Sequence, residues 1–320
     1  MVFFSMSRKG NGYIFHSRSA SCLSPWIQKT RLSTLPNPIS TTQPKLIDTM
    51  PKLKDLLSHL NESLPNNPPS LYIDLEGRAL SRHGSISIMQ IFHLPLDQIY
   101  LVDVHTLGAA AFTTPADSKT DTNQAQPGPQ PCTLSLKSIL ESPSVEKAFF
   151  DVRADSDALY AQYGIYLAGI QDIQLMELAA RTHDRTLLWG LGKCILRDAG
   201  LSTSGAGILR RIKRRGLRLS TPERGGSYDV FNERPMSQGM IDYCALDVGV
   251  LPRLWGVYSR RLRGKRGAVW RERIREETRR RVDVCFDVGR DGGARDQRAG
   301  GVFAPASFRE GGEGAGTDGG

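Results

Sequence analysis

The segment Leu71–Gly77 constrains the fold most strongly, because it fits a β-strand with two unlike faces. Its apolar residues alternate with Tyr72, Asp74 and Glu76, and a period of two is that of a strand. Asp74 and Glu76 therefore project from one side. Two adjacent carboxylates in an apolar strand repel each other and lose hydration unless a cation neutralises them. The pair is a candidate site for Mg²⁺ or Mn²⁺, with solvated acids at a strand end as the alternative.

The pattern of predicted elements indicates an α/β fold. Three strands with short connections predict an antiparallel meander, and a β-α-β unit follows it. We therefore expect a ribonuclease H-like mixed sheet, three antiparallel strands and then parallel strands, flanked by helices. The expected strands are 71–77, 85–93, 98–104 and 147–152, and the expected helices are 52–64, 134–140, 155–163, 172–182, 187–198 and 235–258.

Composition divides the chain into an ordered part and two tails. Residues 1–45 form a basic, Ser-rich stretch without Asp or Glu, which fits a mitochondrial transit peptide or a plain disordered tail. Residues 46–262 form the expected domain, with a disordered insertion at about 113–131. A basic helical extension is expected at 263–288, and a disordered Gly-rich tail at 289–320.

Charge and cysteine content limit the partners and the compartment. The formal net charge of +9 favours a polyanionic partner, nucleic acid first and an anionic membrane second. No apolar run approaches the ~20 residues of a membrane span. The five cysteines are scattered, which argues against a disulfide framework and a zinc site. We expect an intracellular protein, in nucleus or cytoplasm, with the mitochondrion as the alternative.

Two further patterns carry acidic residues into predicted helices. Asp155 follows a buried strand and lies at a helix N-terminus, where a carboxylate is favoured and where a simple helix cap is the alternative. Tyr243 and Asp247 lie four residues apart beside an apolar stripe, so they share one helix face. A surface Tyr and Asp with chance spacing is the alternative for this second pair.

Together these three patterns resemble the DEDD superfamily of 3′–5′ exonucleases, in its Tyr-containing, ribonuclease D-like branch. The resemblance covers about 46–262 and rests on the order and spacing of three motifs. The His-containing branch would place His at position 242, which is Asp242 here. The motifs are Leu-Tyr-Ile-Asp-Leu-Glu-Gly at 71–77, Asp-Ser-Asp-Ala-Leu at 155–159 and Tyr-x-x-x-Asp at 243–247.

The resemblance implies a metal-dependent hydrolase. Two Mg²⁺ or Mn²⁺ ions about 3.5–4 Å apart would clamp the scissile phosphate. Asp74, Glu76, Asp155 and Asp247 would be the metal ligands, with Asp74 bridging both ions. Tyr243 would orient the attacking water, and the product would be a 5′-nucleoside monophosphate. Asp151 and Asp157 are weaker candidates than Asp155, which lies four residues before Leu159 as the family pattern requires.

A basic run at 210–215 lies where we expect a helix to give way to a loop. Five of its residues are candidate phosphate contacts for RNA or single-stranded DNA, with a solvated basic face as the alternative: Arg210, Arg211, Lys213, Arg214 and Arg215. The alternative to an active exonuclease is a catalytically weak nucleic-acid-binding or scaffold protein on the same fold. Protein partners, and the choice between RNA and DNA, stay open at this stage.

Overall fold

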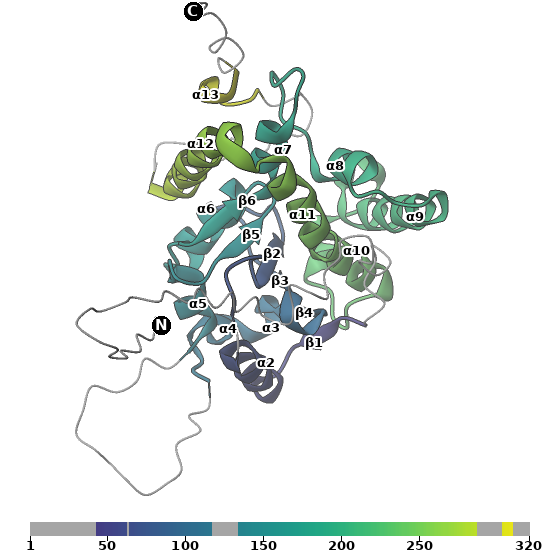
Figure 1. Cartoon of the computed structure of the whole chain (residues 1–320). Coiled ribbons are helices and arrows are strands. Elements are labelled where there is room, and N and C mark those ends of the chain that lie inside the picture. Colours follow the sequence, from purple (N-terminus) through teal and green to yellow (C-terminus); the bar gives the residue numbers. More distant parts are fainter. Residues whose placement is uncertain (1–42, 63, 117–133, 287–302, 310–320) are drawn as a thin grey trace, which may run out of the picture. The chain divides into compact units, whose positions relative to one another are not determined.

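A six-stranded sheet forms the centre of the computed structural model, which describes residues 43–62, 64–116, 134–286 and 303–309 (Figure 1). Residues 1–42 of the expected N-terminal tail and most of the expected insertion lie outside these residues. The strands are β1 (Lys45–Ile47), β2 (Leu71–Glu76), β3 (Ile88–His93), β4 (Gln98–Asp103), β5 (Lys147–Phe149) and β6 (Ile170–Asp172), in the spatial order β1-β4-β3-β2-β5-β6.

The sheet is mixed, as expected. Strands β2, β3 and β4 form an antiparallel meander, while β5 and β6 continue from β2 in parallel. β1 pairs in parallel with the far edge of the meander and was not anticipated. β2 therefore has a neighbour on both sides, and Asp74 lies opposite Gln90 of β3. This central place explains the near-complete burial of its apolar side chains.

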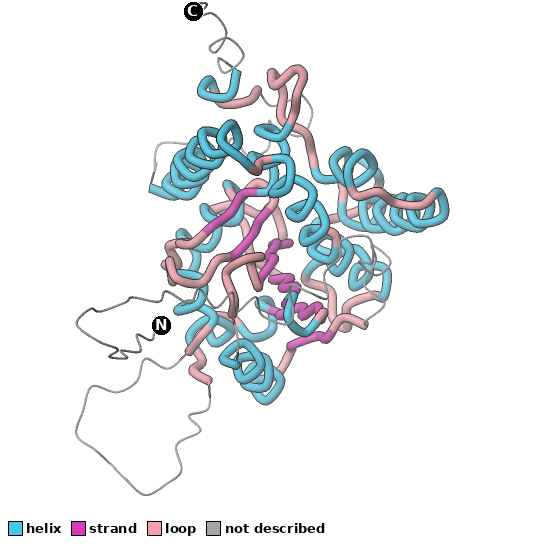
Figure 2. Tube along the Cα trace, viewed as in Figure 1, coloured by secondary structure: helices cyan, strands magenta, loops and turns pink. Residues whose placement is uncertain are grey.

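Helices cover the sheet and connect its strands (Figure 2). None of the helices in the described ranges is both long and apolar enough to cross a membrane. Their bounds are α2 (Met50–Glu62), α3 (Val104–Leu107), α4 (Ala110–Thr113), α5 (Leu136–Glu141), α6 (Arg153–Tyr163), α7 (Ile173–Ala180), α8 (Leu191–Asp198), α9 (Thr203–Ser220), α10 (Gln238–Gly249), α11 (Leu251–Arg261), α12 (Gly264–Asp283) and α13 (Ala306–Arg309).

Each face of the sheet has its own apolar core. Leu71, Ile73 and Leu75 of β2 belong to one core, together with side chains of α2, α5 and α6. Tyr72 points to the other core, which is built from α7, α8, α10 and α11. Because strand side chains alternate, Asp74 and Glu76 lie on the Tyr72 side. α10 packs across β2, β3 and β4 on this side, so it lies beside both carboxylates.

Two helix predictions were wrong in detail. The helix expected over 235–258 is divided at Val250 into α10 and α11, because Pro252 has no N–H to continue the α10 hydrogen bonds. The basic run at 210–215 does not lead into a loop but lies inside α9, which continues to Ser220. Ser202 starts α9 by accepting a hydrogen bond from the Gly205 N–H.

The C-terminal part of the chain also contributes to the described fold. α12, in the expected basic extension, packs on α7 and β6. Within the expected Gly-rich tail, residues 303–309 are described, and Phe308 is buried against the Trp270 ring. Ala304 N–H donates to the Thr186 carbonyl, which ties this short segment to the loop after α7.

Candidate active site

Asp74, Glu76 and Asp247 form a compact carboxylate cluster. One carboxylate oxygen from each lies within 4.8 Å of the others. The first two come from β2, and Asp247 comes from α10, where it is 3% exposed. Burial raises the pKa of the Asp247 carboxyl, and the Lys213 ammonium opposes that shift. Three oxygen donors held this closely are the ligand set that Mg²⁺ and Mn²⁺ prefer, so the residues present fit such an ion.

Asp155 lies near this cluster but is not one of its three members. It occupies the first turn of α6 and is 4% exposed. Burial and then the neighbouring Asp74 raise the pKa of the Asp155 carboxyl well above its ordinary value. Asp155 therefore interacts electrostatically with Asp74 and Glu76, because each close negative charge disfavours ionisation of the next.

The two weaker candidates beside Asp155 have other partners. Asp151 forms a two-pronged ion pair with Arg153, at 2.6 Å for each contact. Asp157 pairs with Arg82 at 2.6 and 2.9 Å. Asp151 and Asp157 are therefore each paired with an arginine. Among the three acids of this segment, Asp155 is the one that interacts with Asp74 and Glu76.

The electrostatic interaction of Asp155 with the neighbouring acids makes the free energy of unfolding depend on pH. In chelator, the folded protein holds the Asp155 proton to a higher pH than the unfolded chain does, so stability decreases as pH rises above about 4. We expect Asp155→Asn to flatten this slope and to melt at a higher temperature than wild type at neutral pH. Thermal melts across pH 4 to 8 check this, with exposed Asp55→Asn melting like wild type. An unchanged slope in Asp155→Asn would contradict the prediction.

Tyr243 lies one helical turn before Asp247 and is 8% exposed. Burial, followed by the charges of Glu76 and Asp247, raises the pKa of the Tyr243 phenol well above its ordinary value. Near neutral pH the phenol therefore keeps its proton, and its hydroxyl can orient a water by hydrogen bonding. This protonation state suits the positioning role better than a role as general base.

Gly216 of α9 makes room for Tyr243. A Cβ at position 216 would lie 2.1 Å from Cδ2 of the Tyr243 ring. We expect Gly216→Ala to move the ring and lower the catalytic rate about 100-fold, the scale associated with a misplacement of ~1 Å. Steady-state kinetics on a labelled oligonucleotide would measure the loss.

Gly207→Ala is the matched control on the same helix. A Cβ at position 207 meets nothing within 4 Å, so the change should stabilise α9 by about 0.5–1 kcal/mol and leave activity intact. Full activity in Gly216→Ala, or an equal loss in both variants, would show that the close contact with Tyr243 does not position the phenol.

α9 brings Lys213 into the carboxylate cluster. The Lys213 ammonium forms an ion pair with Asp247 and lies 4.8 Å from the centre of the Tyr243 ring. Its four basic neighbours are exposed instead: Arg210, Arg211, Arg214 and Arg215. The five predicted phosphate contacts therefore have two different environments. Helical spacing distinguishes Lys213 from the other four residues. Position 213 lies on the face of α9 that carries the buried residues Leu209, Gly216 and Ser220.

Comparisons with known proteins relate the chain to one family and to several solved structures. A profile of the 3′–5′ exonuclease family matches residues 45–262. The Trypanosoma brucei RNase D complex with RNA U12 is similar in fold, with a TM-score of 0.60, 20% identity, and coverage of 85% of this chain and 80% of that one.

Two further solved structures share the fold. Trypanosoma brucei RNase D on its own has a TM-score of 0.50, 23% identity, and coverage of 68% and 65% of the two chains. The catalytic core of Trypanosoma brucei RRP6 has a TM-score of 0.50, 16% identity, and coverage of 76% and 55%. The search of curated proteins gave no match. The family profile spans more than half of the chain, and this protein therefore belongs to the 3′–5′ exonuclease family of hydrolytic nucleases.

Proposed function

We propose that this protein is a metal-dependent exonuclease that removes nucleotides from the 3′ end of a nucleic acid strand and releases 5′-monophosphates. The observation that carries the proposal is the cluster of Asp74, Glu76 and Asp247 within 4.8 Å, with Asp155 coupled to it. RNA is the favoured substrate class, because a structure of similar fold, Trypanosoma brucei RNase D, was solved with RNA U12.

The carboxylates divide into two sets of metal ligands. Divalent cations bound there would lower the pKa of the attacking water and offset the negative charge of the scissile phosphate. Asp74, Glu76 and Asp247 would hold one cation, since their oxygens converge. Asp155 would help to hold a second cation, because its buried carboxyl lies near the cluster and interacts electrostatically with Asp74. The fold holds these four acids close together in a partly buried site, despite their mutual repulsion.

Tyr243 and Lys213 act beside the carboxylates. The protonated Tyr243 hydroxyl would hold the attacking water by a hydrogen bond, as its raised pKa permits. The Lys213 ammonium lies between Asp247 and the Tyr243 ring, where a positive charge favours an arriving phosphate. Both side chains are held by α9 and α10, so the packing of these two helices governs the site.

The exposed arginines of α9 would contact the phosphates of the strand. Replacing two of them, Arg210→Gln with Arg214→Gln, should weaken binding of all sequences and reduce the slope of log K against log salt by about 1.4. Fluorescence anisotropy with a single-stranded oligonucleotide in Ca²⁺ would measure this slope. Lys52→Gln with Lys54→Gln on α2 is the control, because α2 covers the opposite face of the sheet. Equal salt-dependence slopes in the two double variants would show that Arg210 and Arg214 do not contact the phosphates.

The proposal is tested with a strand labelled at its 5′ end. RNA and DNA of one sequence are incubated with the full chain and Mg²⁺, Mn²⁺ or EDTA. We expect a ladder that shortens from the 3′ end, requires metal, and forms faster on RNA. Binding without cleavage under every metal condition would contradict the proposal and would favour a binding or scaffold role on this fold. Faster shortening of DNA would contradict the assignment of the substrate class alone.

A further inference from the structure

Asp172 joins the starts of two helices. Its carboxylate accepts hydrogen bonds from the N–H groups of Asp151, at 3.1 Å, and Val152, at 3.3 Å, just before α6. It also accepts from the N–H groups of Gln174, at 2.9 Å, and Leu175, at 3.4 Å, at the start of α7. Asp172 is fully buried. One carboxylate therefore holds the turn that leads into the helix carrying Asp155.

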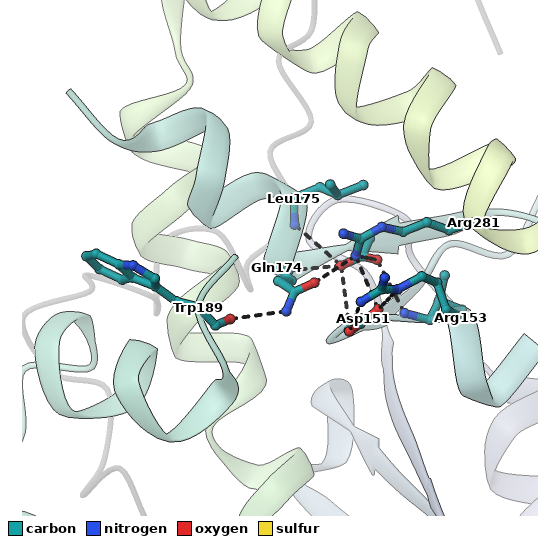
Figure 3. Close-up of polar contacts among 8 residues, drawn as sticks. Asp151, Arg153, Gln174, Leu175, Trp189 and Arg281 are labelled. Carbon is teal, nitrogen blue, oxygen red and sulfur yellow. Dashed lines mark hydrogen bonds and ion pairs between the residues drawn. The ribbon is translucent and has the colours of Figure 1, made fainter. Parts of the chain in front are cut away.

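Arg281 supplies the positive charge that Asp172 needs. Its Nη1 lies 2.7 Å from Asp172 Oδ2, 2.9 Å from Gln174 Oε1 and 3.4 Å from Asp151 Oδ1. The Arg281 side chain is 3% exposed, although it belongs to the basic α12. Figure 3 shows Arg281 reaching from its helix to the group that contains Asp151 and Arg153. A buried carboxylate without such a partner would be strongly unfavourable.

The turn held by this network has a constrained backbone. Asp151 has a φ of +67°, a left-handed conformation that non-glycine residues rarely adopt. Its side chain is fixed by Arg153, and its N–H is fixed by Asp172. Asp155 follows four residues later, in the first turn of α6. The direction in which α6 leaves the turn therefore depends on contacts that Arg281 completes.

The same C-terminal segment is attached to α6 on the other side of Asp155. Ser156 Oγ donates to the Val282 carbonyl at 3.0 Å. Arg82, which pairs with Asp157, also donates to the Cys285 carbonyl at 3.1 Å. Residues on both sides of Asp155 are thus tied, directly or through one partner, to residues 281–285. The match to the exonuclease family ends at residue 262, before this segment begins.

We propose that Arg281 is a positioning residue for the exonuclease site, because it holds Asp172 and the turn that presents Asp155 to Asp74. The inference rests on the proposed function and extends the functional unit beyond the family match, through the end of α12. Arg281 also forms ion pairs with Asp151 and Asp172, two acids whose negative charges act on Asp155.

The test compares Arg281→Gln and Arg281→Lys in the full chain. Arg279→Gln is the control, because Arg279 is an exposed arginine on the same helix. Titration calorimetry measures Mn²⁺ binding without nucleic acid, and kinetics separate kcat from KM. We expect Arg281→Gln to weaken Mn²⁺ binding and lower kcat by about 10–100-fold each, with KM within about twofold. Arg281→Lys, which keeps the charge, should restore part of both losses, and Arg279→Gln should match wild type.

Asp155→Asn is the reference for the metal defect, and Arg281→Gln should resemble it. A folded Arg281→Gln with wild-type kcat and Mn²⁺ binding would overturn the inference while leaving an active wild type, and hence the proposed function, intact. If Arg281→Gln does not fold, the Arg281→Lys variant is used instead. Wild-type kcat and Mn²⁺ binding in Arg281→Lys would overturn the inference, and reduced values of both would support it. A wild type that neither binds Mn²⁺ nor shortens a strand would overturn both proposals.

Discussion

Asp74→Asn is expected to lower the rate of strand shortening by about 1,000-fold or more. Asp74 is the acid that joins the two sets of proposed ligands, since it belongs to the cluster with Asp247 and also acts on Asp155. Loss of several kcal/mol of transition-state stabilisation corresponds to about three powers of ten in rate. The measurement is single-turnover cleavage of a labelled strand in saturating Mg²⁺.

The fold should survive this change. Asn has nearly the shape of Asp, and removal of the Asp74 charge relieves repulsion within the cluster. Circular dichroism and a thermal melt in chelator should therefore show a folded protein at least as stable as wild type. Asp55→Asn on α2 is the control and should keep wild-type activity, because α2 covers the opposite face of the sheet. Activity in Asp74→Asn within tenfold of wild type would contradict the assigned site.

Glu177→Gln is expected to lower the free energy of unfolding by about 3–5 kcal/mol. Glu177 and Arg181 form a two-pronged ion pair at 2.5 and 2.7 Å, and both side chains are at most 3% exposed. Arg181 also lies 4.0 Å from the centre of the Trp189 ring. Loss of the Glu177 charge would leave the Arg181 guanidinium buried and unpaired, which explains the size of the effect. Urea denaturation of the two proteins would measure the difference in the free energy of unfolding.

Glu272→Gln is the matched control for this prediction. Glu272 pairs with Arg275 on α12, and their side chains are 57% and 66% exposed. An exposed pair on a helix contributes only about 0.3–0.5 kcal/mol, because solvent screens it. A loss of less than 1 kcal/mol in Glu177→Gln, or equal losses in the two variants, would show that burial does not determine the contribution of the Glu177 pair.

Local sequence patterns predicted the elements that carry the proposed catalytic groups. Alternation along β2 placed Asp74 and Glu76 on one face, and the four-residue spacing placed Tyr243 and Asp247 on one side of α10. Both patterns act over a few residues, and packing in the core reinforces them. The meander of β2, β3 and β4 could be predicted for the same reason, since short connections leave few alternatives.

Contacts between distant parts of the chain gave no comparable signal. Arg281 and Asp172 are 109 residues apart, and the sequence around Arg281 does not indicate which distant residue it contacts. The inward direction of Lys213 depends on α9 being a continuous helix, whereas the sequence was expected to pass from a helix into a loop at 210–215. Charge repulsion disfavours that helix locally, and its packing on α10 overrides the local preference.

The most direct test follows an RNA strand labelled at its 3′-terminal nucleotide through the first turnover. With Mg²⁺, wild type should release the label as a single nucleoside 5′-monophosphate before any longer labelled fragment appears. Asp74→Asn should release it about 1,000-fold more slowly. Labelled fragments longer than one nucleotide at early times, or equal release by Asp74→Asn, would contradict the account in which the Asp74, Glu76 and Asp247 cluster hydrolyses nucleic acid from its 3′ end.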